Sequence, residues 1–121
     1  MKLKSDPRHI KRAKLMQKLY TWDFITDKKP TGEVRTIISK MKVIDKLIAR
    51  SAPNRPVGQI NKIDLAILRL AIFELIINKE PLKVIIDEAI ELGKQYGSDS
   101  SSSFINGALG QVVKLKGKSE H

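Results

Sequence analysis

The sequence predicts an all-α fold, a bundle of about five helices in two small subdomains. Apolar residues recur at helical spacing through most of the chain, no segment alternates as a strand would, and Pro, Gly and Ser separate the helical segments. A chain of 121 residues suits one hydrophobic core better than two. We therefore expect one domain at 1–121, with N-terminal helices at 7–50, a C-terminal bundle at 57–115 and a frayed tail at 116–121.

The first predicted helix covers residues 7–24. Asp6 precedes it as an N-cap, and Pro7 occupies the first helical position, where a missing N–H costs nothing. At 100° per residue, one face is apolar and the opposite face is basic. The apolar face comprises Ala13, Met16, Tyr20 and Phe24, and the basic face comprises Arg8, Lys11, Lys14 and Lys18.

A loop at 26–32 leads to a second amphipathic helix, predicted at 33–50. The two prolines of SAPNRPVG, 51–58, mark the clearest internal break. The next helix, at 60–77, is apolar almost all round, as expected for a helix surrounded by others. A buried Arg69 within it needs an acidic partner, which Glu74 or a carboxylate of 87–91 would supply.

Two further helices complete the bundle. The first is predicted at 82–96, opened by Pro81 and stopped by Gly97. The serine run at 98–103 then caps a last helix that continues to 115, although such a run could also be a flexible linker. Gly107 and Gly110 each cost this helix about 1 kcal/mol relative to alanine. Close helix packing is the preferred explanation for them, and approach of a ligand is the alternative.

The charge distribution favours a polyanionic partner. Net charge is +10 with a pI near 9.9, and residues 1–18 hold a cluster of cations against the single acid Asp6. The cations are Lys2, Lys4, Arg8, Lys11, Arg12, Lys14 and Lys18. Nucleic acid is the first candidate, ahead of an acidic protein or an anionic membrane. Trp22 falls among these cations and would offer a stacking surface to bases, unless it packs on a neighbouring helix.

Catalytic and cofactor sites are not predicted. The absence of cysteine excludes disulfides and thiolate zinc sites, and His9 and His121 have no patterned carboxylates that would form a metal or acid-base site. GQVVKLKGKS, 110–119, has the wrong glycine spacing for a phosphate loop. No secretory block or membrane span is visible, so we expect a binding protein of the cytoplasm without cofactors.

Four segments in this order carry a family resemblance: RAKLMQKLYTWDF, IDLAILRLAIFELI, PLKVIIDEAIELGKQYG and SFINGAL. They resemble the NusB family of bacterial transcription antitermination factors. The resemblance implies an all-helical domain that binds boxA RNA as a heterodimer with the ribosomal protein NusE and joins RNA polymerase, chiefly on ribosomal RNA operons. It also implies homodimers in some members and no enzymatic activity.

The resemblance also assigns site residues. The RNA-binding set comprises Arg8, Lys11, Arg12, Lys14, Gln17, Tyr20, Ser100, Ser103 and Phe104, and the set facing the protein partner comprises Asp64, Arg69 and Glu74. His9 and Ile10 stand where other members often have arginine. The short loop after Phe24 replaces an additional helix of typical members, so the N-terminal bundle is expected to be one helix shorter.

Two other functions remain open from the sequence. The same helical domain accompanies ribosomal RNA cytosine methyltransferases, so the chain could target RNA in trans for such an enzyme. Alternatively, its basic face could bind an acidic protein, as a helical adaptor. RNA is preferred to DNA because no helix-turn-helix pattern stands out and because of the family resemblance.

Overall fold

The computed structural model describes residues 6–25 and 29–119, with side chains as far as Lys116. The predicted cations Lys2 and Lys4, loop residues 26–28, and His121 lie outside these ranges. The described chain contains α1 (Pro7–Phe24), α2 (Gly32–Ser39), α3 (Met41–Ser51), a short 3₁₀ helix η1 (Val57–Gln59), α4 (Lys62–Ile77), α5 (Leu82–Tyr96) and α6 (Ser101–Ser119). No strand occurs in these residues, so the all-α prediction is confirmed.

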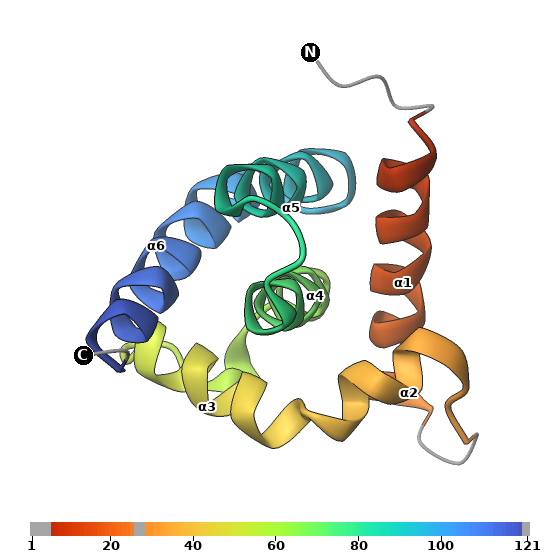
Figure 1. Cartoon of the computed structure of the whole chain (residues 1–121), viewed down its shortest axis with the longest axis horizontal. Coiled ribbons are helices and arrows are strands. Elements are labelled where there is room, and N and C mark those ends of the chain that lie inside the picture. Colours follow the sequence, from red (N-terminus) through yellow and green to blue (C-terminus); the bar gives the residue numbers. More distant parts are fainter. Residues whose placement is uncertain (1–5, 26–28, 120–121) are drawn as a thin grey trace.

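The helices surround α4, which Figure 1 shows end-on at the centre of the molecule. Its buried residues cover almost every side of the helix, from Asp64 to Leu75, as its apolar sequence predicts. The α1 helix packs on one side of α4, while α5, α6 and α3 pack around the rest. One continuous core results, to which all six α-helices contribute.

Local capping explains where the helices begin and end. The Asp6 side chain accepts a hydrogen bond from the Arg8 N–H at 2.8 Å, with Pro7 in the first turn. Asn61 caps α4 by accepting from the N–H groups of Ile63 and Asp64. The Gly97 N–H closes α5 on the carbonyl of Gly93. The predicted bounds of the helices at 7–24 and 82–96 are therefore confirmed.

The prediction of a single helix at 33–50 is wrong. The segment forms α2 and α3, separated at Lys40, whose N–H bonds to the carbonyls of Ile37 and Ile38. The apolar spacing continues across the break, so periodicity alone gives no signal of it. In the connection before α2, the described residues contain no helix, as the short loop predicts.

The junction between α5 and α6 requires glycine. A Cβ at Gly93 would lie 2.9 Å from Ile105 Cδ1, and one at Gly97 would overlap Ser101 and lie 2.8 Å from the Gly93 carbonyl oxygen. Gly107 and Gly110 differ, because a Cβ at either would meet no atom within 4 Å. The close packing expected for these two glycines is therefore absent.

The serine run forms a cap rather than a linker. The Ser98 N–H donates to Ser101 Oγ at 2.8 Å, and the Ser101 N–H donates to the Ser98 carbonyl. At its other end α6 continues to Ser119, and Lys116 donates to the Leu75 carbonyl at 2.6 Å. The tail predicted to fray from 116 is thus helical through Ser119.

Candidate nucleic-acid interface

The exposed side of α1 carries most of the predicted RNA-binding residues. Arg8, Lys11, Lys14, Gln17 and Lys18 are all exposed, and we call them the N-terminal basic face. Lys11 pairs with Glu33 at 2.8 Å, but both side chains are more than half exposed, so water screens the pair. The helix therefore presents mobile cations that could contact successive phosphates.

Tyr20 and Phe24 are two of the three aromatic residues at the C-terminal end of α1. Tyr20 is half-buried against the core, and its ring centroid lies 5.0 Å from that of Phe24. Phe24 was expected to face the core, yet it is 58% exposed. Tyr20 is thus partly exposed, whereas the exposure of Phe24 shows that the apolar face predicted for this helix is wrong at that residue.

Arg12 does not belong to the exposed cations. Its side chain is buried, and it holds both carboxylate oxygens of Glu74 at 2.8 to 3.1 Å and Glu88 at 3.4 Å. Burial opposes its charge, but Glu74 and Glu88 outweigh that effect and raise the pKa of Arg12. The expectation that Arg12 contacts RNA is corrected, because the guanidinium ties α1 to α4 and α5.

His9 lies beside this pair and is also buried. Its Nδ1 is 2.7 Å from Glu88 Oε2, and its Nε2 is 2.7 Å from Gln95 Oε1. Burial would lower the pKa of His9, but the hydrogen bonds to Gln95 and Glu88 and the nearby carboxylates raise it. Among the described residues, no group of three potential metal ligands could hold a metal ion. His9 is instead held by hydrogen bonds to Glu88 and Gln95.

Arg69 is paired, but not with the predicted acids. Its Nε and Nη2 donate to the two oxygens of Asp45 at 3.0 and 2.9 Å, and Nη1 donates to Asp23 at 3.2 Å. Asp23 also pairs with Lys62. Burial would raise the pKa of Asp23, but these two cations lower it. Arg69 therefore joins α4 to α1 and α3, and Glu74 serves Arg12.

The residues expected to face a protein partner are turned inward. Asp64 and Arg69 are 3% and 6% exposed, and Glu74 is held by Arg12. The Oδ1 atom of Asp64 has no hydrogen-bond partner within the described residues, although Asp64 lies in the first turn of α4, where a negative charge is favoured. Asp64 and Arg69 thus offer little surface to a partner, whereas Glu74 is partly exposed, and the predicted partner contact of these residues stays a prediction.

The predicted residues near the start of α6 form a separate surface. Ser100 and Ser103 are exposed, and the Arg55 guanidinium lies 4.3 Å from the centroid of the half-buried Phe104 ring. Arg55, Ser103, Phe104 and Gly107 line a hollow of about 430 Å³. Figure 1 shows α6 and α1 on opposite sides of α4. Phe104 of this surface therefore contacts Arg55, and the surface is not continuous with the N-terminal basic face.

Sequence reasoning missed several residues that organise these surfaces. Arg55 gives no signal beyond its place in a proline-rich loop, and Asp23, Asp45 and Gln95 are ordinary polar residues of amphipathic helices. Their roles arise from contacts between distant segments.

In the part of the chain that the structure describes, no helix is long and apolar enough to cross a membrane.

Comparison with known proteins gives a consistent result. The model of the NusB family matches residues 31–114. The transcription antitermination protein NusB of Roseiflexus castenholzii is 59% identical over 73 residues, which cover 58% of this chain and 51% of that protein. The NusB protein of Anaeromyxobacter dehalogenans strain 2CP-1 is 44% identical over 82 residues, which cover 68% and 58% of the two chains. The chain spans about half the length of the curated relatives it matches.

Solved structures share the fold. A structure of T. maritima NusB has a TM-score of 0.79 and 30% identity, covering 90% of this chain and 92% of the other. A structure of NusB and NusE in complex with double-stranded RNA has a TM-score of 0.75 and 20% identity, covering 91% and 99%, which supports the fold alone. Because the family model matches well over half of the residues, this chain belongs to the NusB family.

Proposed function

We propose that this chain is an RNA-binding transcription antitermination factor that recognises single-stranded, boxA-like RNA through the N-terminal basic face. In this proposal it acts as a heterodimer with a NusE-like ribosomal protein and joins RNA polymerase in the cytoplasm, chiefly on ribosomal RNA operons. The observation that carries it is the exposed row of Arg8, Lys11, Lys14 and Lys18 in a member of the NusB family.

Binding without chemistry is sufficient for this function. Lysine and arginine that neutralise phosphates release condensed counterions, and this release provides affinity that falls steeply with salt. Gln17 and Tyr20, next to the cations on α1, are suited to hydrogen bonding and stacking with unpaired bases. The surface of Ser100, Ser103 and Phe104 is proposed as a second contact, where Arg55 and the Phe104 ring provide a cation and an aromatic edge.

The position of Arg12 refines the proposed site. Because Glu74 and Glu88 hold its guanidinium, Arg12 supports the N-terminal basic face by fixing α1 against α4 and α5. The proposed phosphate contacts are therefore Arg8, Lys11, Lys14 and Lys18. Asp64, Arg69 and Glu74 are proposed to shape the partner surface from within, because Asp64 and Arg69 are buried and the charges of Arg69 and Glu74 are paired with internal neighbours.

The test is fluorescence anisotropy of a labelled boxA-like RNA and a scrambled control, each titrated with the chain across a salt series. Both titrations are repeated with the NusE-like protein of the same organism. We expect tighter binding to the boxA-like RNA, with selectivity that increases when the partner is present.

Equal binding to both RNAs that the partner leaves unchanged would reject the antitermination proposal. Tight binding to an acidic protein, with no preference for RNA over other polyanions, would favour the protein-binding adaptor instead. A chain that binds ribosomal RNA only beside a modifying enzyme would favour the targeting role in trans.

A further inference from the structure

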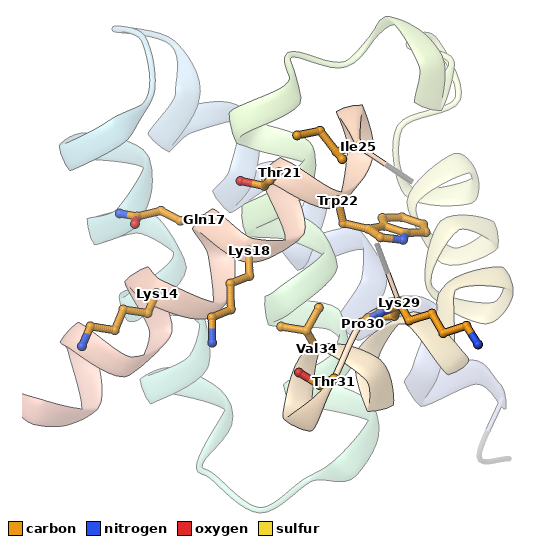
Figure 2. A pocket seen from close by; sticks show the side chains of 10 residues that line it. All are labelled: Lys14, Gln17, Lys18, Thr21, Trp22, Ile25, Lys29, Pro30, Thr31 and Val34. Atoms are coloured by element: carbon orange, nitrogen blue, oxygen red, sulfur yellow. The ribbon is translucent and has the colours of Figure 1, made fainter. Parts of the chain in front are cut away.

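A groove runs beside the exposed stripe of α1 and the start of α2, with a volume of about 490 Å³ (Figure 2). Lys14, Lys18 and Thr21 line it from α1, because residues three or four apart share a helix face, and Ile25 lines it from the position after the helix. Val34 lines it from α2. Lys14 and Gln17 also belong to the N-terminal basic face, so the groove continues the proposed RNA surface around the helix.

The charged residues among the described lining of the groove are all cations. Lys14, Lys18 and Lys29 line it, and no carboxylate is among its described lining residues. None of these three lysines forms an ion pair with a described residue, so their charges are not neutralised within the described protein. Figure 2 shows Lys14 and Lys18 extending from the same side of α1. An anionic ligand would therefore find exposed cations that form no ion pair within the described residues.

A flat aromatic surface lies at the other end of the groove. Trp22 is half-buried against the core, and the Arg69 guanidinium lies 5.8 Å from its ring centroid. The indole also lines the groove, next to the apolar side chains of Ile25 and Val34. Trp22 follows Lys14 by eight residues, about 12 Å along a helix. The groove thus combines Lys14 and Lys18 at one end with an aromatic plane at the other, where Lys29 also lies.

We propose that this groove binds a segment of single-stranded RNA, with one base stacked on Trp22 and backbone phosphates at Lys14 and Lys18. Cationic grooves with aromatic platforms are the general means of binding unpaired nucleic acid. This inference rests on the proposed function, because the RNA would reach the groove by crossing the N-terminal basic face. It extends the site from the N-terminal basic face to Trp22 and the start of α2.

Single-stranded RNA fits this groove better than an acidic helix does. A helix that docks in a groove needs a continuous apolar floor for anchors at i, i+3 or i+4, and i+7. Here lysines and threonines interrupt the apolar lining, and the apolar groups gather around Trp22. The shared Lys14 and Gln17 give further support, because one strand can contact both surfaces.

Trp22 makes the proposal directly testable, since it is the only tryptophan in the chain. The full chain is titrated with a boxA-like single-stranded RNA while Trp22 emission and the anisotropy of a labelled RNA are recorded in parallel. We expect saturable quenching of Trp22 with the same midpoint as the anisotropy change. A polyglutamate peptide is the comparison polyanion and is expected to leave the emission nearly unchanged.

The variant is Lys14→Ala with Lys18→Ala, and the matched control is Lys42→Ala with Lys46→Ala. Both pairs are exposed lysines four residues apart, the control pair on α3. Loss of two phosphate contacts should weaken RNA binding about tenfold near 0.15 M salt and lower the log-log salt slope by about 1.4. The control should change affinity by less than about twofold.

The outcomes separate this inference from the proposed function. RNA binding by anisotropy with unchanged Trp22 emission would overturn the groove and leave the antitermination proposal standing. Equal effects of the two lysine pairs would overturn the groove and would also remove Lys14 and Lys18 from the phosphate contacts of the proposed function. Stronger quenching by polyglutamate than by RNA would overturn it in favour of an acidic protein. No RNA binding in either readout would reject both proposals.

Discussion

The Nδ1 atom of His9 lies 2.7 Å from Oε2 of Glu88, although the two residues are 79 positions apart. The Nε2 atom faces Gln95 Oε1 at the same distance, so both ring nitrogens point at oxygen atoms. Only the protonated imidazolium can donate from both nitrogens. This arrangement between α1 and α5 therefore favours the protonated histidine, with Glu91 adding negative potential and Arg12 bonded to the same Glu88 carboxylate.

This arrangement predicts that stability decreases as pH rises. The pKa of His9 is raised in the folded chain, while the unfolded chain keeps the ordinary value of about 6.5. The stabilisation is therefore complete below that ordinary value and is lost as pH increases through the raised folded pKa. Urea unfolding between pH 5.5 and 9 should show this decrease. His9→Gln should flatten it, and His121→Gln should not. An identical pH profile in His9→Gln would refute the assignment.

The Arg69 contacts predict that lysine cannot replace this arginine. A lysine keeps the charge but cannot hold both oxygens of Asp45 and reach Asp23 with a planar fork. Hydrogen bonds to charged groups contribute about 1.5 to 3 kcal/mol, so Arg69→Lys should lower the free energy of unfolding by about 2 kcal/mol. Arg50→Lys, at the exposed end of α3, is the control and should change it by less than about 0.5 kcal/mol. Equal stability of the two variants would contradict the proposed clamp.

The glycines of α5 and α6 predict opposite effects of alanine. At Gly97 the new methyl group would overlap Ser101 and approach the Gly93 carbonyl, so Gly97→Ala should destabilise the chain by at least about 1 kcal/mol. At Gly107 the methyl group meets open space, so Gly107→Ala should stabilise it by up to about 1 kcal/mol. Thermal unfolding of both variants provides the measurement. A loss of stability in Gly107→Ala would show that the site is more crowded than the structure indicates.

The bounds of α1 and α5 could be predicted because local chemistry determines them. Asp6, Pro7 and Gly97 act on their immediate neighbours, so the sequence around each residue contains the necessary information. The break at Lys40 could not be predicted, because it has neither glycine nor proline and the apolar spacing continues through it. Both α2 and α3 pack against α4, and the sequence of a single segment does not contain such contacts.

The candidate site was predicted only in part, because the buried face of α1 is rotated by roughly 50° from the apolar stripe of its sequence. Leu19 and Arg12 lie in the core, whereas Ile10 and Phe24 are exposed. A prediction from helical periodicity treats arginine as a surface residue, so it places the buried Arg12 on the exposed face. Only the positions of Glu74 and Glu88, on two other helices, explain why Arg12 is inside.

The last prediction compares Arg8 with Arg12. Substitution of Arg8 should change RNA affinity, whereas substitution of Arg12 should change the stability of the fold. Arg8 is exposed, so Arg8→Ala should leave the unfolding midpoint unchanged and lower the log-log salt slope of RNA binding by about 0.7, one phosphate contact on a single strand. Arg12→Ala leaves Glu74 and Glu88 without their shared cation, so it should cost about 3 kcal/mol of stability. Where the Arg12→Ala chain remains folded, its salt slope should be preserved. Urea unfolding and anisotropy on both variants test this division, and a reduced slope in folded Arg12→Ala would return Arg12 to the RNA surface.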